Sequence, residues 1–201
     1  MTCVNSWVVW LTSTWVIEMN DYQLSVVKQH IKFEDIAVAL SRICRFGGRG
    51  KRFYSVLSHS LVVGSLIASF GPEYELAGLL HDAAEIYIGD TQAPFKTWAQ
   101  CQLEDEVLPH MFEAMELDWP DKIVWEIVKQ ADIDACSAEW VELGMDRKET
   151  WVDRLPASDK AIKLTRRFAC TPPDSWISDG IYLYQTFKFK CVCLKETLTR
   201  G

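Results

Sequence analysis

The sequence lacks the features of a chain that crosses a membrane or coats a nucleic acid. Its 201 residues carry 28 acidic and 21 basic side chains, and the net charge of −7 argues against binding a nucleic-acid polymer. The apolar stretch at residues 7–11 is too short to span a bilayer and has no basic region typical of a signal peptide. Internal repeats, low-complexity tracts and linkers are also missing. We therefore expect one domain over residues 1–201, without a membrane partner.

The cysteines lack a pairing pattern. Seven are present, an odd number with irregular spacing and no CxxC pair. Cys44 and Cys136 fall within apolar helical patterns, where buried free thiols are common. The sequence therefore predicts free thiols in a reducing compartment, which is the cytoplasm, or the host cytoplasm if the chain is viral.

The central part of the chain has the apolar periodicity of helices. Hydrophobic residues make up 49% of the sequence and charged residues 24%, which is typical of a globular protein. Helical spacing, glycine or proline stops and capping residues predict a mostly α fold with a helical core over about residues 34–170. The predicted helices cover residues 34–44, 55–70, 72–88, 98–115, 120–143 and 157–169.

The two ends of the chain have a different pattern. Residues 6–11 and 14–19 are rich in Val, Ile and Trp, which predicts a short N-terminal β-hairpin within residues 1–20. Residues 174–201 form a C-terminal extension in which residues 187–193 alternate between apolar and polar, so this part is either a strand or a late addition of another kind. The same alternation explains Cys191 and Cys193 better than a metal-binding pair does.

Three ionisable residues interrupt an apolar run at His81, Asp82 and Glu85. The preceding residues read as a buried helix, and burying charged groups there costs several kcal/mol unless they are paired or bind a metal. Glu85 follows His81 by one helical turn, so the two share a face. This cluster indicates a functional site more readily than a packing role.

Two more candidates lie on other predicted helices, at His59 and Asp132. Together with His81 and Asp82, they would converge inside one bundle as a mixed nitrogen and oxygen set suited to Zn, Mn, Co or Fe. A metal there would lower the pKa of bound water. Taken alone, His59 also fits a packed histidine with a satisfied hydrogen bond.

The order of these residues resembles the H…HD…D signature of HD-domain metal-dependent phosphohydrolases, which implies an HD-domain helical bundle. The resemblance covers about residues 34–143. Further motifs resemble those of the bacterial 5'-deoxynucleotidases and of the phage dATP triphosphohydrolases from viruses whose DNA carries 2-aminoadenine. These motifs are Cys44-Arg45-Phe46, Ser58-His59-Ser60, His81-Asp82-Ala83-Ala84-Glu85, Gly89-Asp90, Ala93-Pro94-Phe95-Lys96 and Val128-Lys129-Gln130-Ala131-Asp132.

The resemblance implies a role for each matching residue. Glu85 would hold or deprotonate the attacking water, and Asp90 would hydrogen-bond the water or the leaving oxygen. A turn carboxylate that caps the next segment is the alternative for Asp90. The metal ligands would be His59, His81, Asp82 and Asp132, holding a divalent ion such as Zn, Co, Mn or Mg.

The substrate would be held by three further residues. Arg45 offers phosphate oxygens a fixed fork of donors, and Lys96 is a second cation for phosphate or else a solvated surface residue. The apolar ring of Phe46 would face the sugar and leave a ribose 2'-hydroxyl unpaired, which favours deoxyribose.

The resemblance therefore implies an enzyme that attacks the α-phosphate of a small-molecule deoxynucleotide. The first expectation is a dATP triphosphohydrolase that releases deoxyadenosine and triphosphate, and the runner-up is a general 5'-deoxynucleotidase acting on monophosphates. A signalling phosphohydrolase would need additional charged motifs around the second helix, which the sequence lacks. The alternative outside the enzymes is a catalytically inactive HD module that only binds a nucleotide. Nine tryptophans also favour a homo-oligomer.

Overall fold

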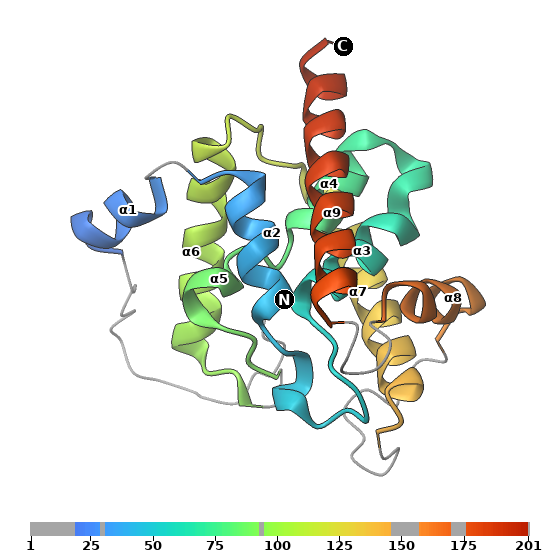
Figure 1. The fold of residues 1–201 in the computed structure, drawn as a ribbon. Coiled ribbons are helices and arrows are strands. Elements are labelled where there is room, and N and C mark those ends of the chain that lie inside the picture. The colour runs from blue at the N-terminus through green and yellow to red at the C-terminus, as the bar shows by residue number, and fades with distance from the viewer. Residues whose placement is uncertain (1–18, 29–30, 93–94, 146–156, 170–175, 201) are drawn as a thin grey trace.

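A computed structural model of the chain describes residues 19–28, 31–92, 95–145, 157–169 and 176–200, and it is mostly helical (Figure 1). Most of the predicted helices are confirmed. The predicted β-hairpin lies in residues 1–18, outside the described residues, except for Met19. The helices are α1 (Asp21–Lys28), α2 (Phe33–Arg42), η1 (Arg45–Gly48), α3 (Val56–Ile67), η2 (Ala68–Phe70), α4 (Pro72–Leu80), α5 (Glu85–Ile88), α6 (Trp98–Ala114), α7 (Lys122–Glu142), α8 (Asp159–Phe168) and α9 (Trp176–Arg200).

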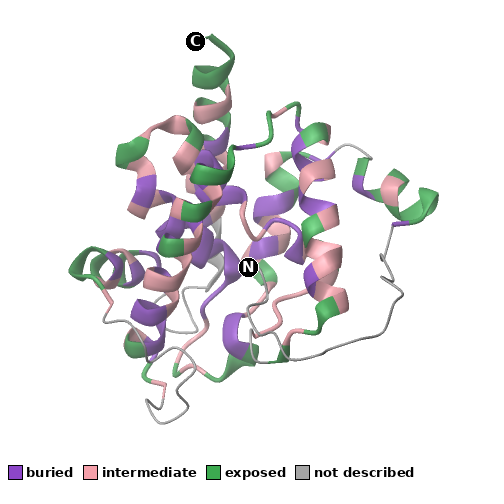
Figure 2. Cartoon of the chain, turned by 180° about the vertical axis from the view of Figure 1, so that it is seen from behind, coloured by how far each residue is buried: buried purple, intermediate pink, exposed green. Residues whose placement is uncertain are grey.

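Helix α3 is the centre of the bundle and is buried along almost its whole length. It begins at Ser55, whose side-chain oxygen accepts a hydrogen bond from the backbone N–H of Ser58 at 3.1 Å. Helices α2, α4, α7, α8 and α9 all contact it. Figure 2 shows the buried residues on the sides of the helices that face one another. A helix that is apolar all round needs this complete cover.

Helices α3 and α4 touch through two glycines. A Cβ atom added at Gly78 would lie 2.9 Å from the Cα of Gly64, which is closer than real Cβ contacts. A Cβ at Gly64 would in turn lie 2.8 Å from Cγ of Leu79. The two backbones therefore approach more closely than any larger residue would allow, and this contact sets the spacing of the side chains further along the interface.

The predicted helix over residues 72–88 is interrupted. Helix α4 ends at Leu80, residues 81–84 form a turn, and the short α5 follows. In the turn, the backbone N–H of Ala83 donates to Leu80 O at 2.9 Å, and that of Glu85 donates to Asp82 O at 3.0 Å. These are bonds over three residues, tighter than those of an α-helix. The His81-Asp82 pair thus lies in a turn, and the prediction of one continuous helix was wrong at this point.

The C-terminal segment is a helix, so the strand, one of the two alternatives for residues 187–193, is wrong. Helix α9 packs against α2, α3 and α4, as Figure 1 shows. Over residues 182–200 of this helix the buried side chains are Leu183, Phe187 and Cys191, which recur every four residues as on one face of a helix. Phe189 and Cys193 lie on exposed positions of the same helix. The apolar residues of the alternation therefore divide between the buried and the exposed face of the helix.

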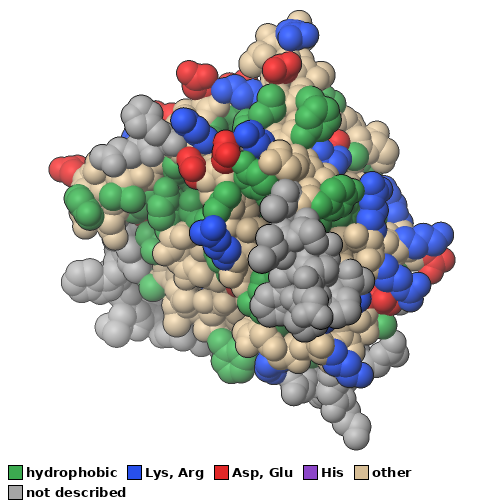
Figure 3. Space-filling view, in the orientation of Figure 1, with side chains coloured by type: hydrophobic (Ala, Val, Ile, Leu, Met, Phe, Trp, Pro, Cys, Tyr) green, Lys and Arg blue, Asp and Glu red, His purple; other side chains and the backbone are tan. Residues whose placement is uncertain are grey.

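Free thiols are confirmed at all five cysteines of the described residues: Cys44, Cys101, Cys136, Cys191 and Cys193. None of the described helices has the length and hydropathy needed to cross a membrane. Basic side chains gather on the outer surface over α8, at the edge of the face that Figure 3 presents. One of them, Arg166, pairs with Glu142 of α7 at 2.7 Å.

Candidate metal centre

Three side chains predicted as metal ligands meet in the interior. His59 comes from α3, His81 from the turn after α4, and Asp132 from the middle of α7. The Nε2 atoms of the two histidines lie 3.2 Å apart, and Asp132 Oδ1 lies 3.1 Å from His59 Nε2. All three ligand atoms lie within 4.8 Å of one another, so this group could hold a metal ion.

The hydrogen bonds of the two imidazoles fit a bound cation. His81 Nδ1 donates to the backbone carbonyl of Gly78 at 2.9 Å, and His59 Nδ1 lies 2.7 Å from Glu139 Oε1. A neutral imidazole has one N–H, so both Nδ1 atoms carry it and both Nε2 atoms present lone pairs. Two lone pairs at 3.2 Å repel one another unless a positive charge lies between them. The donor set therefore suits a metal ion.

The ionisation of His59 supports the same conclusion. Burial and the charge of Arg45 lower the pKa of this imidazole, but Glu139 and Asp132 raise it more, to about 10. In the absence of a metal, the site thus favours a proton on His59. A metal ion would take the place of that proton.

Asp82 lies beside this group and also contacts the guanidinium of Arg45. Its Oδ2 atom is 3.3 Å from His81 Nε2, 3.6 Å from His59 Nε2 and 3.4 Å from Arg45 Nη1. Burial raises the pKa of this carboxyl, and the charges of the two histidines and of Arg45 lower it far more, so it is ionised. Asp82 is therefore placed to join a metal site or to hold the guanidinium.

Arg45 is buried among three carboxylates. Its Nε lies 3.3 Å from Glu139 Oε2, and its Nη1 lies 3.9 Å from Asp90 Oδ1 in addition to its contact with Asp82. Asp90 also accepts a hydrogen bond from the backbone N–H of Phe46 at 3.1 Å. Phe46 has a φ of 56°, which is uncommon for a residue with a side chain, so this bond stabilises the loop that carries Arg45.

Glu85 and Lys96 line the same cavity as Arg45, Asp82 and Asp90. Burial, followed by the charges of Asp82 and Asp90, raises the pKa of Glu85 well above its ordinary value. Lys96 forms an ion pair with Glu104 of α6. Burial lowers the pKa of Lys96, but Glu104 raises it more, so the ammonium stays charged.

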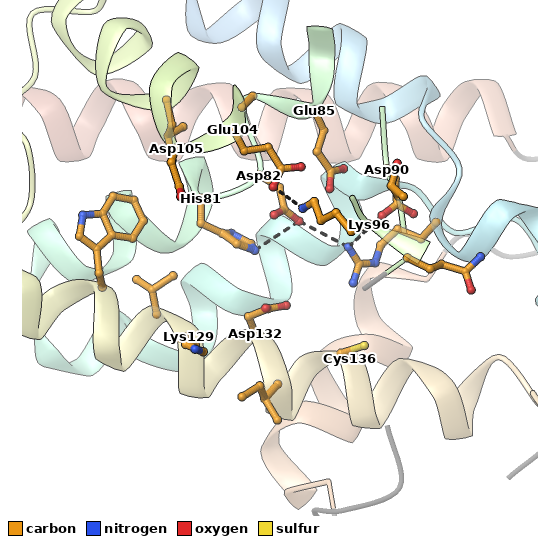
Figure 4. A pocket seen from close by; sticks show the side chains of 18 of the residues that line it. His81, Asp82, Glu85, Asp90, Lys96, Glu104, Asp105, Lys129, Asp132 and Cys136 are labelled. Carbon is orange, nitrogen blue, oxygen red and sulfur yellow. Dashed lines mark hydrogen bonds and ion pairs between the residues drawn. The ribbon is translucent and has the colours of Figure 1, made fainter. Parts of the chain in front are cut away.

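These side chains line one cavity of about 960 Å³. Figure 4 shows Asp82, Glu85, Asp90 and Lys96 on one side of it, with Asp132 on α7 opposite. Toward the start of α7 the cavity wall includes two aromatic rings, Trp119 and Trp125, at a ring-centroid distance of 4.9 Å, together with charged side chains such as Lys122. A volume of this size is in the range of small-molecule sites.

Every residue predicted for the site lies in or beside this cavity, although Phe46 differs in its environment. Its ring is only 2% exposed and packs edge-on against Trp140, with ring centroids 5.6 Å apart. The sequence predicts that this ring faces a sugar. Phe46 does belong to the cavity lining, but only a small part of the ring is exposed there.

Sequence reasoning missed Glu139 and Glu104. Glu139 follows Asp132 by seven residues, two turns of α7, and this spacing could have placed both on one face. Nothing in the sequence connects Glu104 with Lys96. Cys136 also lines the cavity, and burial raises the pKa of its thiol, which favours the protonated form over the nucleophilic thiolate.

The fold and the site define a mostly helical protein with a buried histidine and carboxylate group that could hold a metal. The chain is 32% identical to the uncharacterized protein YfdR of Escherichia coli over 142 residues, which cover 69% of this chain and 76% of YfdR. It is also 43% identical to the uncharacterized protein RCAP_rcc00048 of Rhodobacter capsulatus over 72 residues, 33% of this chain and 37% of that protein. No protein-family model matches. The chain belongs to the family of YfdR.

Proposed function

We propose that the protein is an HD-domain phosphohydrolase that depends on a divalent metal and cleaves deoxynucleotides at the α-phosphate. The convergence of His59, His81 and Asp132 beside a buried Arg45 carries this proposal. A metal group next to a fixed guanidinium is an arrangement that suits a phosphoryl group. The substrate we favour is dATP, with deoxyadenosine and triphosphate as products.

The metal would be held by His59, His81 and Asp132, with Asp82 as a fourth ligand. When bound, a divalent ion such as Zn, Co, Mn or Mg supplies a Lewis acid that polarises a phosphoryl oxygen and makes water more acidic. Asp82 keeps one oxygen near Arg45 at 3.4 Å, so the same carboxylate would orient the metal site and the phosphate-binding cation.

Arg45 would bind the phosphoryl oxygens as negative charge develops on them. Its guanidinium is held by Asp82, Asp90 and Glu139, so little reorganisation is needed when a phosphate arrives. Lys96 would add a second positive charge at the same side of the cavity, where Glu104 keeps it in place.

Glu85 would accept the proton of the attacking water. A carboxylate with a raised pKa is a stronger base than an exposed one, and burial next to Asp82 and Asp90 provides this property. The deoxynucleoside leaves once its 5' oxygen has received a proton. Phe46 would close the sugar side with an apolar ring, which offers no partner to a ribose 2'-hydroxyl.

The decisive experiment incubates metal-depleted protein with each dNTP, dNMP and NTP, with and without Zn, Co, Mn or Mg. We expect metal-dependent release of triphosphate from dATP. Release of phosphate from monophosphates at similar rates would instead identify a general 5'-deoxynucleotidase. Equal turnover of ATP and dATP would contradict the proposal that Phe46 selects deoxyribose over ribose.

Two variants test the site itself. His81→Ala should abolish both metal binding and hydrolysis, whereas His110→Ala should change neither, because His110 is on the surface of α6 and pairs with Glu113. Hydrolysis by His81→Ala, or activity that persists after removal of metal, would contradict the mechanism. Metal and nucleotide binding without turnover would identify a binding module.

A further inference from the structure

Glu139 is a fully buried carboxylate that contacts both His59 and Arg45. It lies on α7, two turns after Asp132, in the half of the helix that faces α3 and the Arg45 loop. One of its oxygens contacts His59 and the other contacts Arg45. A buried carboxylate without positive partners costs several kcal/mol, and these two contacts offset part of that cost.

The contact with His59 determines which ring nitrogen faces the metal group. Glu139 Oε1 lies 2.7 Å from His59 Nδ1, and a carboxylate only accepts hydrogen bonds. The proton of a neutral His59 must therefore sit on Nδ1, which leaves Nε2 free to bind a metal. Asp132 and His81 face that same Nε2 atom.

The contact with Arg45 holds the guanidinium from behind. Glu139 Oε2 is 3.3 Å from Arg45 Nε, as an ion pair that lacks the alignment of a hydrogen bond. The Nη1 atom of the same guanidinium turns toward Asp82 and Asp90. Because Glu139 engages the Nε side, Nη1 stays on the side of Asp82 and Asp90, which line the cavity where a phosphate would lie.

We propose that Glu139 is a positioning residue that couples the two halves of the site. Through His59 it orients a metal ligand, and through Arg45 it orients the cation that binds phosphate. The metal half rests only on the group of His59, His81 and Asp132, whereas the phosphate half rests on the proposed function.

The metal half is tested with Glu139→Gln in metal-free protein. An amide can turn either its oxygen or its nitrogen toward His59, so the position of the imidazole proton is no longer determined. We expect Mn or Zn affinity, measured by isothermal titration calorimetry, to fall about 10- to 100-fold. In protein saturated with Zn, where the metal takes the place of the extra proton on His59, nitrogen-15 NMR of the histidines should show His59 with Nδ1–H in the wild type and a mixture of the two tautomers in the variant.

The matched control is Glu142→Gln, three residues further along α7. Glu142 also pairs with an arginine, Arg166, but at the surface, so metal affinity and the His59 tautomer should stay unchanged. Unchanged affinity and tautomer in Glu139→Gln would overturn the metal half, whether or not the protein hydrolyses any nucleotide. If Glu139→Gln does not fold, Glu139→Asp replaces it, because a shorter carboxylate keeps the charge but withdraws from His59. Wild-type affinity in that variant would likewise overturn the proposal.

The phosphate half is tested by the binding of inorganic triphosphate to protein saturated with Mn. Saturation removes the effect of metal affinity, so a further loss of about tenfold or more in Glu139→Gln would come from Arg45. Arg45→Lys should show a similar loss. Loss in Arg45→Lys but not in Glu139→Gln would overturn the coupling through Glu139. Equal binding by the wild type and both variants would contradict the proposed function and leave the metal half standing on its own test.

Discussion

The interface between α3 and α4 has two ends that differ in chemistry. At one end Gly64 and Gly78 bring the backbones into contact without any side chain between them. At the other end His59 and His81 face one another with ring centroids 5.1 Å apart. His81 is only three residues from Gly78, and its Nδ1 bonds to that glycine's carbonyl. The glycine end thus sets the distance between the two imidazoles.

The comparison shows how the molecule separates stability from chemistry. The glycine end is surrounded by apolar side chains such as Leu79 and Ile67, which contribute to stability by burial. The histidine end collects buried carboxylates and one guanidinium, which cost desolvation energy. Groups of this kind are retained where binding or catalysis needs them.

The largest effect is expected in the apolar core, away from the charged groups of the histidine end, at Phe187 of α9. This side chain is fully buried, and its helix covers α2 and α4. Phe187→Ala should lower the free energy of unfolding by about 4 kcal/mol, as for other buried phenylalanines, measured by urea denaturation. Phe189→Ala, an exposed position on the same helix, should change it by less than about 0.5 kcal/mol. Equal effects of the two would show that α9 does not pack as described.

A change at the glycine contact should affect both ends. In Gly78→Val the new side chain meets the backbone of Gly64, and we expect a loss of about 3 kcal/mol in unfolding free energy. Metal affinity should also fall in the folded protein, because the helices must separate and carry His59 away from His81. Ser65→Ala on α3 serves as a control and should leave both quantities unchanged. A destabilised variant with wild-type metal affinity would show that the two ends are independent.

The fold was predictable where apolar periodicity decides it, as in α3, α6, α7 and α8. Prediction was ambiguous in α9, because the apolar and polar residues around Phe187 alternate as they would in a strand. It failed at His81-Asp82, where α4 gives way to a turn. At this point the backbone hydrogen bonds span three residues, as in a turn, where an α-helix would have bonds over four. No local sequence rule distinguishes the two patterns.

The candidate site was predictable in its metal group, since histidine and carboxylate at His59, His81 and Asp132 are costly within apolar helices. Its supporting contacts were not. Glu139 pairs with His59 across 80 residues of sequence, and the ion pair of Lys96 with Glu104 depends on how α6 packs. Such contacts arise from tertiary structure, so composition and spacing in one segment cannot reveal them.

The histidine end should be stabilised by metal. At a free Mn or Zn concentration 100 times the dissociation constant, binding should add about 2.7 kcal/mol to the free energy of unfolding. A thermal or urea transition recorded with and without metal measures this. His81→Ala should lose the response, whereas Phe189→Ala should retain it. If no divalent ion raised the free energy of unfolding of the wild type, a bound metal would not explain why the two imidazoles lie so close together.

The effect of pH on Glu85 has a defined sign. Burial, Asp82 and Asp90 raise the pKa of Glu85 in the folded protein above the 4.5 of a free carboxyl, so the folded state holds this proton more tightly than the unfolded state. Its contribution to stability is complete below about pH 4.5 and is lost as the pH rises toward the raised pKa. Glu85→Gln does not titrate, so metal-free variant and wild type should diverge above pH 4.5, with the variant gaining about 1.4 kcal/mol for each unit by which the pKa is raised. Glu142→Gln should change in the opposite direction, because Arg166 lowers the pKa of Glu142. If the free energy of unfolding of Glu85→Gln and of the wild type changed with pH in parallel, folding would not raise the pKa of Glu85. The contrast between the two ends of the interface would then rest on the metal group alone.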